Sequence, residues 1–173
     1  MLPKLTFVLG GAASGKSLWA ENLLLSSHLE PVYLATARVF DDEIFSKVLL
    51  HKNRRGPVWT NLEAEIDLGT PLEQLEHNQA VLIDCATMWL TNLMMDHLDV
   101  EPAMDGLLNA LRSCLASVVV VSNEVGHGIV PENALARRFR EAQGQLNCAL
   151  AAQADLAVFV TAGLPQVLKG RLP

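Results

Sequence analysis

The sequence is short of positive charge and has no long apolar run. Its 173 residues include 13 lysines and arginines against 19 aspartates and glutamates, which gives a net charge of -6 at pH 7. Binding to nucleic acid or to an anionic membrane depends on a positive field, so neither partner is expected. No apolar stretch approaches the ~20 residues that span a bilayer. A small anionic substrate still fits this composition, because a local basic cluster is enough to bind it.

Paired cysteines are also absent. Cys85, Cys114 and Cys148 are far apart in the sequence and form no CxxC motif, so neither a zinc site nor a disulfide framework is expected. Reduced, scattered cysteines are typical of a cytoplasmic protein, and we expect that location here. The first residues resemble a leader peptide only faintly, and we interpret them as a strand followed by a loop.

The apolar residues that are present predict an α/β fold. Half of the residues are hydrophobic and 18% are charged, which is typical of a globular chain, and we expect a single domain over residues 1–173. Apolar runs uninterrupted by polar residues favour a mostly parallel sheet with helices on both faces, a three-layer arrangement. The predicted strands are Leu5–Gly10, Pro31–Ala37, Gln79–Cys85, Ala116–Glu124 and Asp155–Gly163. The predicted helices span about Lys16–Ser27, Asp41–Lys52 and Asn133–Gln153.

A phosphate-binding loop follows the first predicted strand. Residues 10–17, GGAASGKS, match G-x-x-x-x-G-K-[ST] between an apolar strand and a helix, the context that this motif requires. Glycines let backbone N–H groups approach the phosphates, Lys16 can reach the β- and γ-phosphates, and Ser17 can bind Mg²⁺. The sequence therefore predicts a P-loop NTPase-like fold that binds a nucleoside triphosphate. The predicted contacts are Gly10, Gly11, Ala12, Ala13, Ser14, Gly15, Lys16 and Ser17.

A P-loop also needs an acidic residue near the metal. Asp84 ends the run VLID and is our first choice, and Glu124, after VVVVSN, is the alternative; either carboxylate would otherwise be an exposed strand end. The D-x-x-G and N-K-x-D patterns of GTPase switches are absent from the sequence. A small-molecule kinase is the default function for a P-loop chain of this size.

Two further blocks are more specific than the P-loop. One is NEVGHGIVPE from Asn123 to Glu132, followed by Arg137, Phe139, Arg140, Gly144 and Asn147; the other comprises Asp84, Cys85, Thr87, Trp89, Leu90 and Asn92. With these blocks the chain resembles, from Gly10 to about Gly170, the bifunctional adenosylcobinamide kinase/adenosylcobinamide-phosphate guanylyltransferases of cobalamin biosynthesis. One departure is Ala13, where the family usually has arginine. The phosphate cradle does not need that side chain.

The resemblance implies two reactions and their cofactors. The hydroxyl of adenosylcobinamide takes the γ-phosphoryl group of ATP or GTP, and GTP then transfers GMP to the new phosphate, with release of pyrophosphate. Mg²⁺ is the implied metal, held by Ser17 and Asp84. The resemblance also implies a homotrimer, and it names a corrinoid, adenosylcobinamide, as the substrate.

The resemblance also places a guanylylated histidine at His51, in the stretch HKNRRGPVW. A neutral imidazole can attack the α-phosphorus and divide one displacement into two. The local sequence alone favours a structural role instead, in which His51 simply ends a helix and binds a carbonyl. The implied nucleotide contacts are Lys52, Asn53, Arg54, Arg55 and Glu63, with Leu34, Ala35 and Thr36 on the second strand.

Two other functions are compatible with the sequence. One is a P-loop small-molecule kinase without nucleotidyl transfer, in which His51 is structural. The other is a non-catalytic nucleotide-binding regulator, which would leave His51 and the NEVGHGIVPE block without a role.

Overall fold

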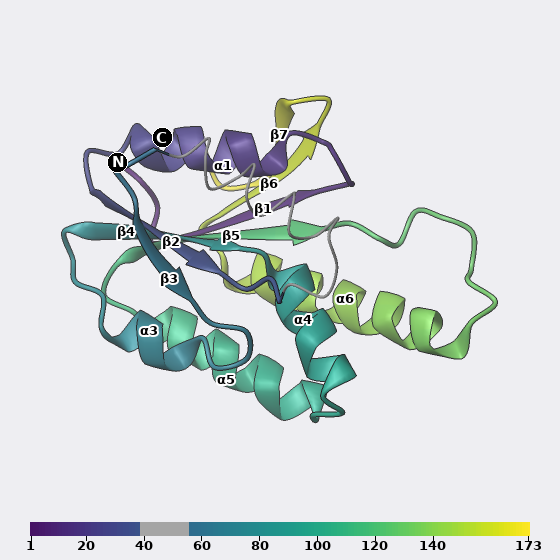
Figure 1. The fold of residues 1–173 in the computed structure, drawn as a ribbon. Helices are drawn as coiled ribbons and strands as arrows, with labels where there is room; N and C mark the ends of the chain where they lie inside the picture. Colours follow the sequence, from purple (N-terminus) through teal and green to yellow (C-terminus); the bar gives the residue numbers. More distant parts are fainter. Residues whose placement is uncertain (39–55) are drawn as a thin grey trace.

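The computed structural model describes residues 1–38 and 56–173. Seven strands in this part of the chain form one sheet in the order β3-β2-β4-β5-β1-β6-β7, parallel from β3 to β6 and antiparallel only between β6 and β7 (Figure 1). The strands are β1 Leu5–Gly10, β2 Glu30–Ala35, β3 Thr60–Glu63, β4 Gln79–Asp84, β5 Ser117–Asn123, β6 Leu156–Thr161 and β7 Leu164–Lys169. The predicted mostly parallel α/β fold is confirmed.

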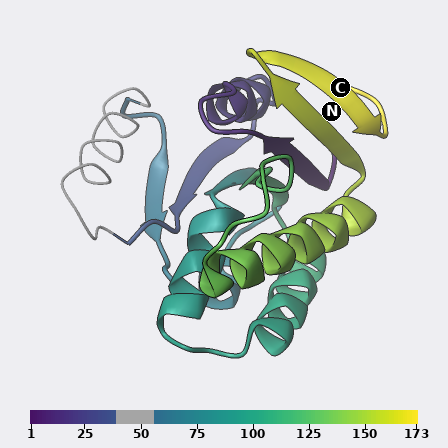
Figure 2. The ribbon, with the colours of Figure 1, turned by 90° about the vertical axis from the view of Figure 1, so that its right-hand side faces the viewer.

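Helices cover both faces of this sheet, as Figures 1 and 2 show. One face carries α1, Lys16–Leu25. The other face carries α3 Gly69–Glu73, α4 Ala86–Met95, α5 Val100–Ser113 and α6 Ala134–Gln153. None of the helices in the described part of the chain combines the length and the apolar character that crossing a bilayer requires.

The central strands are apolar throughout because the sheet is covered on both sides. On β5, Val118 and Val120 pack with α4, α5 and α6, while Val119 and Val121 pack in the core beneath α1. Alternate residues of a strand point to opposite faces, so a strand between two layers of helices needs apolar residues at nearly every position. The uninterrupted runs in the sequence have this cause.

Five predicted strands coincide with β1, β2, β4, β5 and β6 to within two residues, and the helices predicted near Lys16 and Asn133 are α1 and α6. The strands β3 and β7 and the helices α3, α4 and α5 were not predicted. The helix predicted over 41–52 lies outside the described residues.

The helix α4 is fastened to the loops beside it by two side chains. Buried Trp89 donates its indole N–H to the Ile66 carbonyl at 2.7 Å. Buried Asn92 donates to the carbonyls of Thr36 at 2.8 Å and Glu65 at 2.9 Å. These bonds tie the ends of β2 and β3 to α4, at the edge where the parallel strands end.

Candidate nucleotide-binding site

The loop between β1 and α1 has the backbone shape of a phosphate cradle. Gly15, directly before α1, has a φ of 88°, where a side chain would be strained. Gly10 is required by space instead, because a Cβ there would lie 2.7 Å from the Val160 carbonyl oxygen. Ser14 fixes the loop from outside, since its carbonyl accepts from the Gly163 amide at 2.8 Å. The loop therefore needs glycine at positions 10 and 15.

Lys16 is a buried cation at the start of α1. It is 9% exposed, and its Nζ donates to the Gly11 carbonyl at 3.1 Å. Burial lowers the pKa of Lys16, and the electrostatic influence of the neighbouring Cys85 and Asp84 opposes that shift. Ser14 Oγ is also buried and has no hydrogen-bond partner among the described residues. A bound phosphate would satisfy both groups, and the N-terminus of α1 adds partial positive charge.

Asp84 is the acidic residue that the fold brings beside Lys16. It ends β4, and the Tyr33 hydroxyl donates to its Oδ2 at 3.0 Å. Tyr33 packs in the core beneath α1, so this carboxylate lies on the face of the sheet that carries α1. Its negative charge opposes the lowering of the Lys16 pKa that burial causes, so the two groups interact electrostatically.

The donors at this edge suit Mg²⁺. Among the residues that the structure describes, no three histidine, cysteine or acidic side chains come together as a metal site. Mg²⁺ commonly binds through one or two carboxylates, with substrate phosphates and water completing its shell. The Asp84 carboxylate and the Ser17 hydroxyl, in the first turn of α1, fit an ion that arrives with the nucleotide.

Glu124, the alternative acid, is engaged in the turn after β5. Its backbone N–H donates to the Gly10 carbonyl at 3.0 Å, and its carboxylate accepts from the Gly126 amide. Glu124 therefore shapes this turn, whereas Asp84 interacts with Lys16. Cys85, next to Asp84, has a pKa raised to about 11 by burial, so its thiol stays protonated at neutral pH.

Asn123 lies at the same edge, although sequence reasoning did not include it in the predicted site. In the sheet it pairs with Gly10, the first residue of the cradle. The preceding Ser122 points toward α6, where its hydroxyl donates to Asn147 at 2.7 Å. Because successive side chains of a strand face opposite sides, Asn123 faces α1 and the cradle. A polar residue ending the strand beside the P-loop strand is the signal that would have found it.

A buried polar network holds the Asn123 backbone in place. Its N–H donates to Thr87 Oγ1 at 2.8 Å, and its carbonyl accepts from Asn147 Nδ2 at 3.1 Å. The side chain of Asn147 accepts in turn from Ser122 and from Gln143 Nε2 at 2.9 Å. Residues of both specific sequence blocks therefore meet here, around the end of β5.

The three residues predicted at the end of β2 have different surroundings. Leu34 is buried in the core, and Ala35 ends the strand half-buried. The Thr36 hydroxyl donates to the Cys85 carbonyl at 2.7 Å and accepts from the Cys85 amide at 2.8 Å. Thr36 is fully buried. Through these two hydrogen bonds its hydroxyl links the ends of β2 and β4.

Glu63 is exposed at the end of β3, the outermost strand of this edge, where it pairs with Ala35. Four strand spacings, roughly 19 Å, separate β3 from β1. The structure thus brings together the P-loop, Asp84 and Asn123, and it places Glu63 farther along the same edge. Outside the described residues lie His51, Lys52, Asn53, Arg54 and Arg55.

A glycine-rich loop after the first parallel strand, a buried lysine and an acid two strands away define a P-loop nucleotide-binding protein. A solved structure agrees with this fold: a prototypical ATPase from the type III secretion system of pathogenic bacteria has a TM-score of 0.56 at 9% identity. The match covers 96% of this chain and 57% of that one. An identity this low supports the fold alone.

Sequence comparison is more specific. The model of the cobinamide kinase/cobinamide phosphate guanyltransferase family matches residues 6–168. The bifunctional adenosylcobalamin biosynthesis protein CobP of Pseudomonas aeruginosa is 40% identical over 168 residues, covering 94% of this chain and 96% of the relative. The protein CobU of Salmonella typhimurium is 38% identical over 178 residues, covering 94% and 98%. The chain belongs to the cobinamide kinase/cobinamide phosphate guanyltransferase family. It is a bifunctional enzyme with a kinase and a guanylyltransferase activity.

Proposed function

We propose that both activities use the edge of the sheet where the parallel strands end. In the kinase step the P-loop binds ATP or GTP, and the hydroxyl oxygen of adenosylcobinamide attacks the γ-phosphorus. The bond from that phosphorus to the β,γ-bridging oxygen breaks, a nucleoside diphosphate leaves, and the hydroxyl proton passes to solvent. Buried Lys16 carries this proposal, because its ammonium group and the orphaned Ser14 hydroxyl in the same cradle both suit a phosphate.

The metal has a limited role in this proposal. Mg²⁺ held by Ser17 and Asp84 would offset negative charge on the phosphates. Asn123 would donate its side-chain amide to an oxygen of the transferred group, and Tyr33 keeps the Asp84 carboxylate oriented through its 3.0 Å hydrogen bond.

For the guanylyltransferase we propose a covalent intermediate on His51. An imidazole nitrogen attacks the α-phosphorus of GTP, a P–N bond forms, and pyrophosphate leaves. A phosphate oxygen of adenosylcobinamide phosphate then attacks the same phosphorus, the P–N bond breaks, and adenosyl-GDP-cobinamide is released. Glu63, Lys52, Asn53, Arg54 and Arg55 would contact the nucleotide, with Leu34, Ala35 and Thr36 beside it.

The described flank of the His51 segment supports this placement. The chain leaves β2 at the edge that carries the P-loop, and Arg38 is anchored there by ion pairs to Glu65 at 2.6 Å and to Asp96 at 2.8 Å. The described chain before this segment therefore ends at the edge of the sheet that carries the P-loop. On the family resemblance and the composition, we also propose that the enzyme is a trimer in the cytoplasm.

GTP labelled at its α-phosphate tests the covalent step. With Mg²⁺, wild-type protein should retain an acid-labile, base-stable label, as a phosphorus–nitrogen bond requires. His51→Ala should lose this label and GMP transfer while it keeps kinase activity. His77→Ala, an exposed histidine before β4, is the matched control and should be labelled like wild type.

The outcomes separate the three candidate functions. Label that persists in His51→Ala at the wild-type level contradicts the proposed intermediate. Kinase turnover without any label in wild type indicates a small-molecule kinase in which His51 is structural. Nucleotide binding without turnover of either kind would indicate a non-catalytic regulator.

Replacing Asn123 by alanine should slow the kinase about 100-fold, the usual cost of removing one donor to a developing charge. The backbone bonds of Asn123 to Thr87 and Asn147 remain, so the thermal midpoint should change little. Steady-state kinetics should show the loss in kcat rather than in KM. Asn78→Ala, just before β4 at the opposite edge of the sheet, should behave like wild type. A change confined to KM, or no change, would remove Asn123 from the phosphoryl-transfer site.

A further inference from the structure

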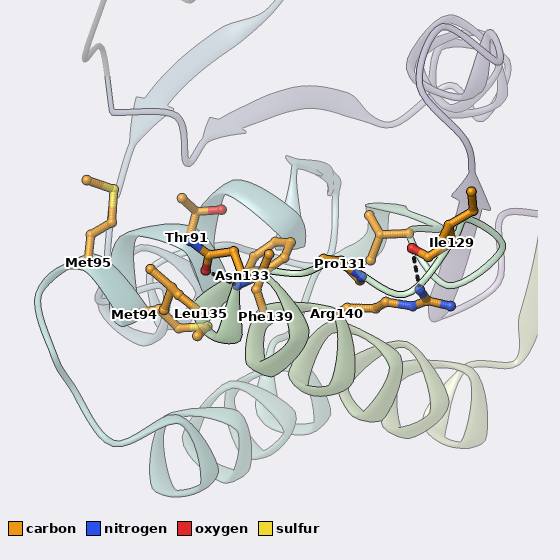
Figure 3. Close-up of a pocket in the computed structure, with 11 residues that line it drawn as sticks. Thr91, Met94, Met95, Ile129, Pro131, Asn133, Leu135, Phe139 and Arg140 are labelled. Carbon is orange, nitrogen blue, oxygen red and sulfur yellow. Dashed lines mark hydrogen bonds between the residues drawn. The ribbon is translucent and has the colours of Figure 1, made fainter.

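A large apolar cavity lies beside the nucleotide site and has no part in the steps above. Its volume is about 770 Å³, within the range of ~300–1,000 Å³ that small-molecule sites usually have. It lies between α4, the loop after β5 and the start of α6, as Figure 3 shows. Its apolar wall includes Met94, Met95, Ile129, Pro131, Leu135 and Phe139.

The loop that forms one side of the cavity is held in shape from α6. Arg140 donates to the carbonyls of Ile129, at 3.1 Å, and Gly126. Arg137 donates to the carbonyl of Pro131 at 2.9 Å. Ile129 is nevertheless 96% exposed. Two arginines thus fix a loop that exposes an apolar side chain, and Met95 and Leu135 in the same wall are exposed too. A group of exposed apolar side chains is typical of a binding site.

One residue of the cavity wall connects it to the phosphate cradle through its neighbour in the chain. Val125 lines it, and the preceding residue, Glu124, donates its amide to the Gly10 carbonyl at 3.0 Å. His127, farther along the same loop, lies with its ring 6.4 Å from that of Phe159 on β6, the other neighbour of β1. The loop that lines the cavity therefore contacts both the cradle and the strand β6 beside it, so a ligand in the cavity would lie near the phosphate cradle.

We infer that this cavity binds the corrin ring of adenosylcobinamide, an inference that rests on the proposed function. The phosphoryl acceptor is one hydroxyl on a short arm of a broad macrocycle, so the ring must lie close to the cradle. Apolar walls with two flexible methionines suit the faces of such a ring. The proximity of the cavity to Gly10 distinguishes this ligand from an unrelated apolar one.

Polar groups around the cavity suit the amide side chains of the ring. The Thr91 hydroxyl donates to the Thr87 carbonyl at 2.9 Å, which leaves its lone pairs for an amide N–H. The side-chain oxygen Oδ1 of Asn133 accepts from the Ala136 amide at 3.1 Å, which leaves the side-chain NH₂ group to donate. The cavity thus offers one acceptor and one donor at its wall.

Ala136→Trp tests this inference, because Ala136 lines the cavity from the first turn of α6 and is only half-buried. The indole should fill the space and weaken binding of adenosylcobinamide at least about tenfold, or ~1.4 kcal/mol. The coloured corrinoid is measured directly, by its partition between protein and filtrate in ultrafiltration. Ala134→Trp, two residues earlier and exposed outside the cavity, is the control and should bind like wild type.

Two further measurements separate the alternatives. Protein labelling by α-labelled GTP should be the same in both variants and wild type, because it needs no corrinoid. Absence of labelling in wild type contradicts the proposed function and leaves the partition result to decide the cavity. Unchanged partition in Ala136→Trp overturns the inference. Unchanged partition with a changed mass in light scattering would show instead that this face meets a second copy of the chain.

Discussion

Lys16→Met should lower the kcat/KM of the kinase by about a thousandfold while the protein remains folded. Methionine nearly matches the length of lysine but carries no charge, so phosphates in the cradle would lose their buried counter-ion. Burial lowers the pKa of Lys16 relative to the unfolded chain, which means that folding disfavours its charged form. A neutral replacement should therefore leave the thermal midpoint equal or raised.

Two measurements on Lys16→Met check these expectations. Kinase assays give the loss of activity, and a thermal melt without nucleotide gives the stability. Added nucleoside triphosphate with Mg²⁺ should raise the melting temperature of wild type but not of the variant, because ligand binding stabilises only a competent site. Lys4→Met is the control, since Lys4 bonds the carbonyls of Leu115 and Ala116 at the opposite edge. An active Lys16→Met protein would contradict the proposed phosphate site.

Asn147→Leu should destabilise the enzyme by about 3 kcal/mol, because three partners each lose a hydrogen bond worth ~1–3 kcal/mol. These partners are the Ser122 hydroxyl, the Gln143 amide and the Asn123 carbonyl. Kinase activity should fall too, even where the protein is still folded, because the Asn123 backbone is no longer held. Urea unfolding measures the first effect, and activity measured well below the transition measures the second.

Asn109→Leu provides the comparison for Asn147→Leu. Asn109 is exposed on α5, so the same substitution there should change stability by no more than ~0.5 kcal/mol. If both variants lose equal stability, the network does not hold the end of β5 as described. If Asn147→Leu keeps full kinase activity at low urea, the position of Asn123 does not depend on Asn147.

The part of the fold that was predictable from sequence is the part with a local cause. The P-loop was predictable because a strand, a turn and a helix N-terminus are adjacent in the chain. The strand β7 was missed because it is exposed along its whole length, and β3 because it has only four residues, mostly exposed. Neither strand carries the apolar run that marks a buried strand.

The residues of the candidate site also differ in whether a local signal in the sequence marks them. Asp84 was predicted because it ends an apolar run, whereas Asn123 was not, because its direction depends on which face of β5 each side chain takes. Thr36 was predicted as a nucleotide contact, but in the structure its hydroxyl forms hydrogen bonds with Cys85, about 50 residues away in the chain. Such a contact is visible only in three dimensions. The role of His51 stays a prediction, which the labelling experiment addresses.

The alternation of side chains along β5 has an evolutionary consequence. Ser122 faces α6, whereas the next residue, Asn123, faces α1, so a single peptide unit separates two chemical tasks. The donor side of the reaction lies beneath α1, and the acceptor side, as we infer it, lies between α4 and α6. Substitutions in the cavity wall that leave Thr87 and Asn147 unchanged need not disturb the donor side, because residues without shared partners contribute almost independently. Such a division would let this scaffold acquire a new phosphoryl acceptor while its machinery for handling triphosphates persists.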